Sequence, residues 1–322
     1  MKKPSLCIVT PALADANNGN WQTAQRWARL LSGHYRVHLL RQWPDTAVPE
    51  ADLLLALHAR RSAASVAAWA ETGRPLVVAL TGTDLYRDIT QDASAQRSLA
   101  LAHRLVVLQE QGPMALPPAL RPKCRVVFQS SPSRQTLRKT TAHLRAVMVG
   151  HLRDEKWPQT LFEAARLLRP GEGIQIDHIG HALDPALGQA AQDTERDCAH
   201  YRWLGGLSHG GARQRIQRAH LLVHTSRIEG GAHVVMEAVL SGTPVLASRI
   251  PGNVGMLGTG YGGYFPPGDA ASLVALLRQC RGDMVAPTGR LAALHAQCEA
   301  RAPLFDPRAE QAALLALLAE LL

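Results

Sequence analysis

The feature that most constrains the fold of this chain is a series of short apolar runs separated by helical patterns. Each run has the length of one buried strand, and amphipathic stretches such as WQTAQRWARLLS and SAASVAAWAETG lie between the runs. Strands that are joined through helices pair in parallel, and the helices then cover both faces of the sheet. The sequence therefore predicts an α/β fold. The candidate strands are SLCIVT, YRVHLL, ADLLLAL, PLVVAL and HRLVVL in the first half, and LRAVMVG, IQIDHIG, HLLVHTS and TPVLAS in the second half.

The domain organisation follows from length and from one polar segment. A chain of 322 residues, of which 46% are hydrophobic, is long enough for two compact domains. Residues 129–143 (QSSPSRQTLRKTTAH) are polar and basic and lack apolar periodicity. We therefore expect one domain over residues 1–143 and a second over residues 144–305. The last helical pattern, within residues 306–322, is apolar on one face, and we expect it to pack back near the first domain.

The net charge of +9 comes almost entirely from arginine, because lysine occurs only at positions 2, 3, 123, 139 and 156. Such a balance fits either a compositional bias or an anionic partner. Aromatic residues make up only 5% of the chain and the arginines are scattered. A nucleic-acid-binding protein would instead need a clustered basic face with aromatic side chains for stacking, so we expect no nucleic-acid partner.

The cysteines and the N-terminus bear on the compartment. The five cysteines form no C-x-x-C pair, which argues against a disulfide framework or a zinc site and for a reducing compartment. The N-terminus, MKKPSLCIVTPALADA, resembles a signal peptide, but Pro11 interrupts its apolar run, and a first buried strand explains it better. No apolar run reaches the roughly 20 residues of a membrane span. We expect a cytoplasmic protein without membrane insertion.

Two glutamates stand out in the stretch SRIEGGAHVVMEAVLSGTPVLAS, residues 226–248. A strand, a Gly-Gly turn and a helix follow one another here, and the helix ends at Ser241-Gly242. Two residues eight apart on one helix would lie about 12 Å apart along its axis, so Glu229 must precede the helix that carries Glu237. Both carboxylates then suit hydroxyl groups at the two ends of a ligand with negative charge between them, such as a nucleotide sugar. The alternative is a loop acid and a helix-surface acid without function.

The same stretch resembles the E-x7-E element of the retaining GT-B glycosyltransferases. The resemblance continues downstream in GGYFPPGDAASLVALL and upstream in VMVGHLRDEKWPQTLFEAARLL and YRWLGGLSHGGARQRIQRAHLLVHTS. It implies the GT-B architecture, with two Rossmann-like domains whose parallel sheets face each other across a cleft. It also implies that the second domain binds a nucleotide-sugar donor and the first domain binds the acceptor.

The resemblance assigns roles on the donor side. Glu229 and the backbone after it would hold the donor sugar and the nearest phosphate, Glu237 the ribose hydroxyls, and Lys156 the charge of the departing diphosphate. His151 stands where the family has an arginine; Arg153 is near enough to substitute, or is a solvated loop charge. The donor-side candidates are Lys156 and Glu229 as catalytic residues, and His151, Arg153, Leu204, Gly205, Gly230, Gly231, Ala232, His233 and Glu237 as binding residues.

The first half carries the acceptor-side candidates. The loop NNGN lies where the family has a glycine-rich loop, and it is either an anion-binding loop or an ordinary helix N-cap. His58 follows a strand and matches a family active-site histidine, and TGTDLY matches a family segment with Thr81 in place of a histidine. The candidates are Asn20 and His58 as catalytic residues, and Asn17, Asn18, Gly19, Arg60, Thr81 and Asp84 as binding residues.

A closer resemblance is to the selenosugar synthases of selenoneine biosynthesis, and it lies in NNGNWQTAQRWA, HARRSAASV, TGTDLYRD and SRIPGNVGMLG. It implies transfer of a sugar from UDP-N-acetylglucosamine or UDP-glucose to selenophosphate, which gives a 1-selenosugar and UDP. A link to a selenophosphate-producing enzyme is also implied. Arg60, Arg61, Arg249, Gly252 and Asn253 are then candidate donors to a small oxyanion. Because no D-x-D sequence occurs, we expect no metal cofactor.

Three other functions remain open at this point. The first is a conventional GT-B glycosyltransferase with a sugar or lipid acceptor. The second is a UDP-sugar epimerase or hydrolase on the same fold. The third is a basic, non-catalytic nucleic-acid-binding protein.

Overall fold

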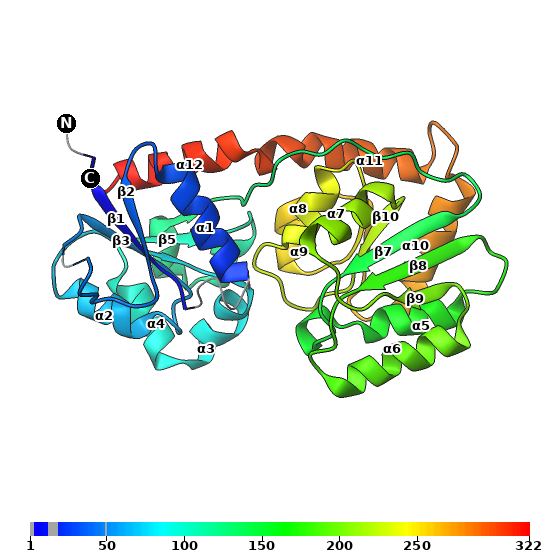
Figure 1. Cartoon of the computed structure of the whole chain (residues 1–322), viewed down its shortest axis with the longest axis horizontal. Coiled ribbons are helices and arrows are strands. Elements are labelled where there is room, and N and C mark those ends of the chain that lie inside the picture. The colour runs from blue at the N-terminus through cyan, green and yellow to red at the C-terminus, as the bar shows by residue number, and fades with distance from the viewer. Residues whose placement is uncertain (1–2, 12–18, 49) are drawn as a thin grey trace. The chain divides into compact units, whose positions relative to one another are not determined.

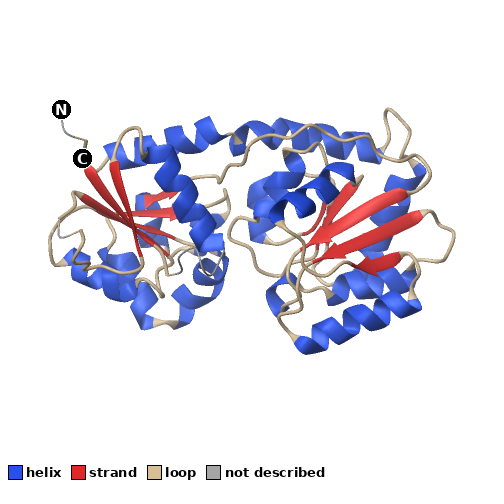
Figure 2. Cartoon of the chain, viewed as in Figure 1, coloured by secondary structure: helices blue, strands red, loops and turns tan. Residues whose placement is uncertain are grey.

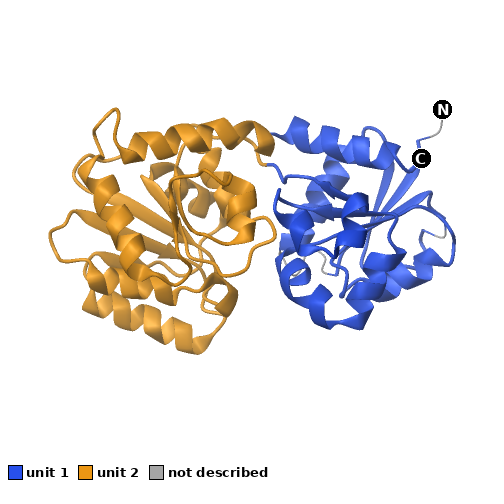
Figure 3. Ribbon diagram, turned by 180° about the vertical axis from the view of Figure 1, so that it is seen from behind, with its two compact units in different colours: residues 1–130, 306–322 blue, residues 131–305 orange. Residues whose placement is uncertain are grey.

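The computed structural model describes residues 3–11, 19–48 and 50–322. The chain divides into two compact units, which are residues 1–130 with 306–322, and residues 131–305 (Figure 3). Each unit contains one six-stranded parallel sheet with helices around it (Figure 2). The α/β fold predicted from the apolar runs is therefore confirmed.

In the first unit the sheet has the strand order β2-β1-β3-β4-β5-β6. Helices α1 and α12 pack on one face of this sheet, and α2 and α4 on the other (Figure 1). The two cores are centred on Trp27 and on Trp69, and both side chains are fully buried. The strands are β1 (Ser5–Val9), β2 (Arg36–Leu40), β3 (Leu53–Leu57), β4 (Leu76–Ala79), β5 (Arg104–Val107) and β6 (Cys124–Val126). The α-helices are α1 (Gly19–Leu31), α2 (Ala63–Ala70), α3 (Ile89–Gln91), α4 (Ala93–Leu101) and α12 (Pro307–Ala319), and a π-helix covers Asp84–Asp88.

In the second unit the order is β12-β11-β10-β7-β8-β9. The helix that carries Glu237 ends as the sequence predicts, because Gly242 has a left-handed φ of 65°. The strands are β7 (Leu144–Val149), β8 (Ile174–Ile179), β9 (Tyr201–Trp203), β10 (Leu221–His224), β11 (Val245–Ser248) and β12 (Tyr264–Phe265). The helices are α5 (Gln159–Leu167), α6 (Pro185–Asp197), α7 (His209–Arg218), α8 (His233–Val239), α9 (Pro251–Leu257), α10 (Ala270–Gly282) and α11 (Arg290–Arg301), with a 3₁₀ turn at Asp154–Lys156.

The boundary between the units lies after Ser130, whereas the sequence places it after His143. The polar composition of residues 129–143 predicts a linker, but residues of this segment form hydrogen bonds to the first unit or to the second. Gln129 is buried and donates to Thr23 of the first unit. Beyond Ser130, Arg134 donates to the Leu240 carbonyl oxygen and Thr136 to that of Ser241, both in the second unit.

The five cysteines are all free and buried. Within the described part of the chain, no helix combines the length and the apolar character that crossing a membrane requires.

Helix α12 is joined to the first unit by the carboxylate of Glu310, whose side chain is fully buried. This carboxylate accepts hydrogen bonds from Arg26 Nε (2.8 Å), Trp27 Nε1 (2.6 Å) and the backbone N–H of Ser130 (2.9 Å). Leu314, Leu317 and Leu318 continue the contact into the core beside Trp27. The last helix is therefore a structural part of the first unit.

We predict that Glu310→Gln destabilises the protein by about 3 kcal/mol, because the substitution removes the buried negative charge to which Arg26, Trp27 and Ser130 donate. Chemical denaturation followed by circular dichroism measures the change. Glu299→Gln is the matched control, since the Glu299 side chain is 76% exposed, and we expect a change within about 0.5 kcal/mol there. Equal losses in the two variants would contradict the assignment.

Candidate active site

The predicted donor-side residues follow strands of the second sheet at their carboxyl ends. Because all strands of this sheet are parallel, the loops after β7, β8, β10 and β11 meet at one edge. The loop after β7 carries Lys156, and the loop after β10 carries Glu229. This edge is the candidate donor site.

Lys156 and Glu229 form an ion pair, in which Lys156 Nζ lies 2.5 Å from Glu229 Oε1. Both side chains are largely buried, with 15% and 12% exposed. Burial alone would raise the pKa of Glu229, but the charge of Lys156 and the nearby His224 hold it well below its usual value. The site therefore contains a paired cation and anion, in which the charge of Lys156 helps to keep Glu229 ionised.

The turn that presents Lys156 is fixed by the loop after β10. Thr225 Oγ1 donates to the Lys156 carbonyl oxygen (2.8 Å), and the Arg227 backbone N–H donates to that of Glu155 (3.0 Å). The Arg227 guanidinium lies 4.2 Å from the centroid of the Trp157 ring. These contacts hold the two loops together independently of the ion pair.

His224 is a member of the site that the sequence did not reveal. It is the last residue of β10, its side chain is 1% exposed, and Nε2 lies 3.2 Å from Glu229 Oε1. The only sequence signal was a histidine within the apolar strand HLLVHTS, which is equally typical of a packed core residue.

The two glutamates occupy the positions that their spacing predicts, Glu229 before helix α8 and Glu237 within it. Glu237 is 7% exposed, so the alternative of a helix-surface acid is wrong. It accepts a hydrogen bond from His209 Nε2 (2.5 Å), and Arg213 Nε lies 3.8 Å from the same oxygen. The hydrogen bond to Glu237 raises the pKa of His209 above its usual value.

Several predicted binding residues are glycines, and their packing explains two of them. A Cβ at Gly252 would lie 2.1 Å from the Glu229 carbonyl oxygen, so only glycine allows the start of α9 to approach this loop. Asn253 beside it is fully buried and donates to the Ser248 carbonyl oxygen at 2.9 Å, so its amide nitrogen faces the protein interior. Gly230, Gly231, Ala232 and His233 form the junction between β10 and α8.

Near the ends of β7 and β8, the rings of His151 and His181 stack with centroids 5.6 Å apart. Burial and then the charges of His181, Arg153 and Lys156 lower the pKa of His151. Arg153 is 48% exposed and its Nε lies 3.7 Å from Glu155. Leu204 and Gly205 follow β9, and their backbones bond to His178 and Gly180 of the neighbouring strand and loop.

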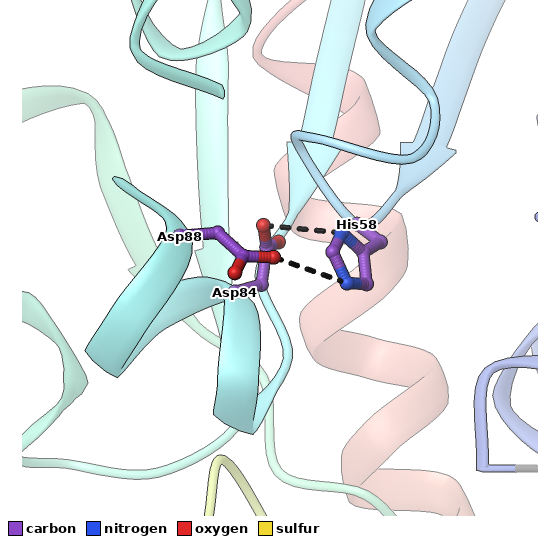
Figure 4. A group of neighbouring side chains, drawn as sticks. All are labelled: His58, Asp84 and Asp88. Atoms are coloured by element: carbon purple, nitrogen blue, oxygen red, sulfur yellow. Dashed lines mark ion pairs between the residues drawn. The ribbon is translucent and has the colours of Figure 1, made fainter. Parts of the chain in front are cut away.

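In the first unit, His58 lies between two aspartates (Figure 4). The ring is 2% exposed; Nδ1 lies 3.2 Å from Asp84 Oδ1, and Nε2 lies 3.7 Å from Asp88 Oδ2. The next two residues bond to the same pair, because the Ala59 N–H donates to Asp84 Oδ2 (2.8 Å) and Arg60 Nε to Asp88 Oδ2 (2.9 Å). His58 has a φ of 75°, which is unusual for a residue other than glycine.

A histidine and two aspartates are also ligands that a divalent cation accepts. Here, however, the two ring nitrogens face different carboxylates, whereas one ion coordinates a single nitrogen of a ring. The guanidinium of Arg60 also bonds to Asp88 Oδ2. The arrangement fits an imidazole clamped between two carboxylates better than a metal centre.

The other acceptor-side candidates lie around this cluster or outside the described residues. Thr81 is half-buried, and its carbonyl oxygen accepts from the Leu85 N–H (2.8 Å). Arg61 is exposed, and its N–H donates to His58 Nδ1 (3.3 Å). Gly19 and Asn20 begin helix α1. Asn17 and Asn18 lie outside the described residues.

We predict that His209 titrates above the usual histidine pKa because it bonds to the Glu237 carboxylate, and that His151 titrates below it because its ring is partly buried and cations lie near it. The stability that the His209–Glu237 pair contributes is complete below the pKa of unfolded histidine and disappears as the pH rises through the folded pKa. NMR titration of the histidine rings measures both values. Glu237→Gln is expected to return His209 towards its usual value and to leave His151 unchanged; shifts of the same sign would contradict this.

Comparisons with known proteins bear on the family and the fold. The family model described as glycosyl transferases group 1 matches residues 130–282, which include Lys156, Glu229 and Glu237. No curated protein sequence matches the chain.

Three solved structures match most or nearly all of the chain. HepE of Anabaena in complex with UDP and glucose is 17% identical, with a TM-score of 0.74, over 99% of this chain and 100% of that chain. Sucrose-phosphate synthase of Thermosynechococcus elongatus is 16% identical, with a TM-score of 0.73, over 99% of both chains. The pneumococcal O-GlcNAc transferase GtfA in complex with UDP and GlcNAc is 17% identical, with a TM-score of 0.63, over 83% of this chain and 57% of that chain. The chain thus has the GT-B fold that its sequence predicts, and residues 130–282 match the model of the glycosyl transferases group 1 family.

Proposed function

We propose that this protein is a glycosyltransferase whose donor is a UDP-sugar. The observation that carries this proposal is the Lys156–Glu229 pair, which lies at the carboxyl edge of a parallel sheet inside the segment that matches the family. Solved HepE structures contain UDP, UDP with glucose, or UDP-glucose, and this supports UDP as the carrier here.

In this proposal the two side chains act on different parts of the donor. The diphosphate gains negative charge as the bond to the sugar breaks, and the ammonium of Lys156 stabilises that charge. The carboxylate of Glu229 accepts hydrogen bonds from sugar hydroxyls, and Glu237 does the same for the ribose. Backbone groups of Gly230 to His233 lie at the start of α8 beside them.

We further propose that the acceptor is selenophosphate, so that the protein is a selenosugar synthase. The support is the sequence resemblance together with Arg60 and Arg61, which follow the clamped His58 at the end of β3. Selenium attacks the anomeric carbon, the C–Se bond forms, and the C–O bond to UDP breaks with its electron pair on the diphosphate oxygen. Water then cleaves the P–Se bond and releases phosphate, and a selenophosphate-producing enzyme supplies the acceptor.

The chemistry of selenium also explains one departure from the family pattern. A selenophosphate nucleophile is soft and already ionised, so it needs little help from a general base. Thr81 can then stand where the family has a histidine. We predict that Thr81→His gives no gain in selenium transfer; a faster variant would count against this explanation.

The acceptor is tested by mass spectrometry of purified protein incubated anaerobically with UDP-N-acetylglucosamine or UDP-glucose, with and without enzymatically generated selenophosphate. We expect a selenosugar together with UDP only in the complete mixture. If the protein binds the UDP-sugar but forms no selenium product, the acceptor is a sugar or a lipid. Free sugar or an epimerised UDP-sugar without acceptor would indicate a hydrolase or an epimerase.

We predict that Lys156→Ala and Glu229→Ala each lower the rate of sugar transfer about a hundredfold or more, because each removes a charged contact to the reacting groups. Steady-state release of UDP measures the rate. Lys139→Ala is the matched control, since Lys139 is a half-buried lysine of the same unit that donates to the Gly242 carbonyl oxygen. Similar losses in the control would show an effect on folding.

A further inference from the structure

His224 lies beside the proposed sugar-binding carboxylate but is placed differently from Lys156. Lys156 is on a turn near the surface, whereas His224 ends a central strand of the sheet and pairs with Ala247 of β11. Both approach one oxygen of Glu229, with Lys156 Nζ at 2.5 Å and His224 Nε2 at 3.2 Å. Oε1 of Glu229 therefore has two neighbouring nitrogen atoms, one from a turn and one from the end of a central strand.

The contact from His224 is not an aligned hydrogen bond. Among the described residues, Nε2 of this buried ring has no hydrogen-bond partner, although Glu229 Oε1 is only 3.2 Å away. A buried N–H without a partner carries a desolvation cost that native structures seldom tolerate without reason. Nε2 of His224 is thus a nitrogen beside Glu229 whose hydrogen bond is not made.

The balance of charge around Glu229 explains when the His224 N–H would be used as a donor. Burial lowers the pKa of His224, so the ring is neutral at neutral pH and donates one N–H. In the proposed reaction Lys156 must serve the diphosphate of the donor, and it then turns from Glu229. The largely buried Glu229 carboxylate needs a replacement donor at that moment, because an unpaired buried charge is strongly unfavourable.

We infer that His224 is a positioning residue for Glu229. When Lys156 turns to the diphosphate of the donor, the Glu229 carboxylate turns to the His224 ring. This inference rests on the proposed UDP-sugar donor. His224 does not touch the reacting atoms; it fixes the carboxylate that binds the sugar.

A purely structural role explains the site less well. The loop after β10 is held to the Lys156 turn by Thr225 Oγ1 and by the Arg227 backbone N–H, and neither contact involves the His224 ring. Its nearest charged neighbours are Glu229 and Lys156. Loss of the ring should therefore affect Glu229 and leave the loops in place.

The test compares the affinities of two ligands by calorimetry. UDP lacks the sugar that Glu229 binds, so His224→Leu is expected to leave UDP affinity unchanged and to weaken UDP-sugar affinity about tenfold or more, as loss of one hydrogen bond to a charged group predicts. His224→Gln keeps an N–H near the position of Nε2, and we expect it to restore most of the loss. The control is His178→Leu, which removes a buried histidine of the same sheet that bonds to Tyr201 at 2.8 Å and should leave the ratio of the two affinities unchanged.

Two results would overturn the inference. One is an unchanged ratio of UDP-sugar to UDP affinity in His224→Leu. The other is an equal loss in the Leu and Gln variants, which would assign the effect to ring shape and not to the N–H group. If the wild-type protein binds neither ligand, the proposed donor fails on its own.

A second measurement does not need a nucleotide. In protein with ¹⁵N-labelled histidine, inorganic pyrophosphate should draw Lys156 away and allow the His224 ring N–H to form a hydrogen bond to Glu229, which shifts its resonance downfield. Glu229→Gln should abolish the shift. If pyrophosphate leaves the resonance unmoved in the wild-type protein, the exchange of partners does not occur and the inference is wrong.

Discussion

The parallel order of the second sheet is the constraint on which the candidate site depends. Strands β7 and β10 are neighbours, so the turn after β7 and the loop after β10 lie side by side at the same edge. This places Lys156 against Glu229, although 73 residues separate them in the chain. The Thr225 hydroxyl and the Arg227 backbone N–H then hold the two loops together through bonds to backbone carbonyl oxygens of the Lys156 turn. An antiparallel pairing would send the two loops to opposite edges and leave both charges without a partner.

The sequence predicts the strands, turns and helices of this site better than it predicts which side chains contact one another. Local patterns are enough to show two parallel α/β units, and the spacing of Glu229 and Glu237 is enough to place one before a helix and one within it. The partner of each side chain depends on which strands are neighbours in the sheet. Contacts between segments that are distant in the sequence decide that strand order. His224 and His209 were therefore missed, since each looked like an ordinary residue of a strand end or a helix start. The unit boundary was misplaced for the same reason, because the polar segment 129–143 is bonded through contacts that its own pattern does not show.

Histidine–carboxylate pairs recur in this protein at strand ends and helix starts. His224 faces Glu229, His209 bonds to Glu237, and His58 lies between two aspartates. In each case the carboxylates are largely buried. An arginine or lysine nitrogen also lies within 4 Å of an oxygen of at least one of them. A buried carboxylate with a single cation loses its charge balance if that cation moves. A histidine beside it supplies a second donor without adding a permanent charge.

The His58 cluster shows how such a pair can shape a loop without touching a substrate. Three consecutive residues, 58 to 60, contact Asp84 and Asp88 through a ring, a backbone N–H and a guanidinium. The left-handed φ of His58 turns the chain sharply after β3, and the two carboxylates hold that turn. The ring itself is buried, so a direct role in acid–base chemistry would require the cluster to open. Arg61 next to it is exposed. The geometry therefore makes His58 the anchor of a short basic loop in which the side chain of Arg61 is exposed.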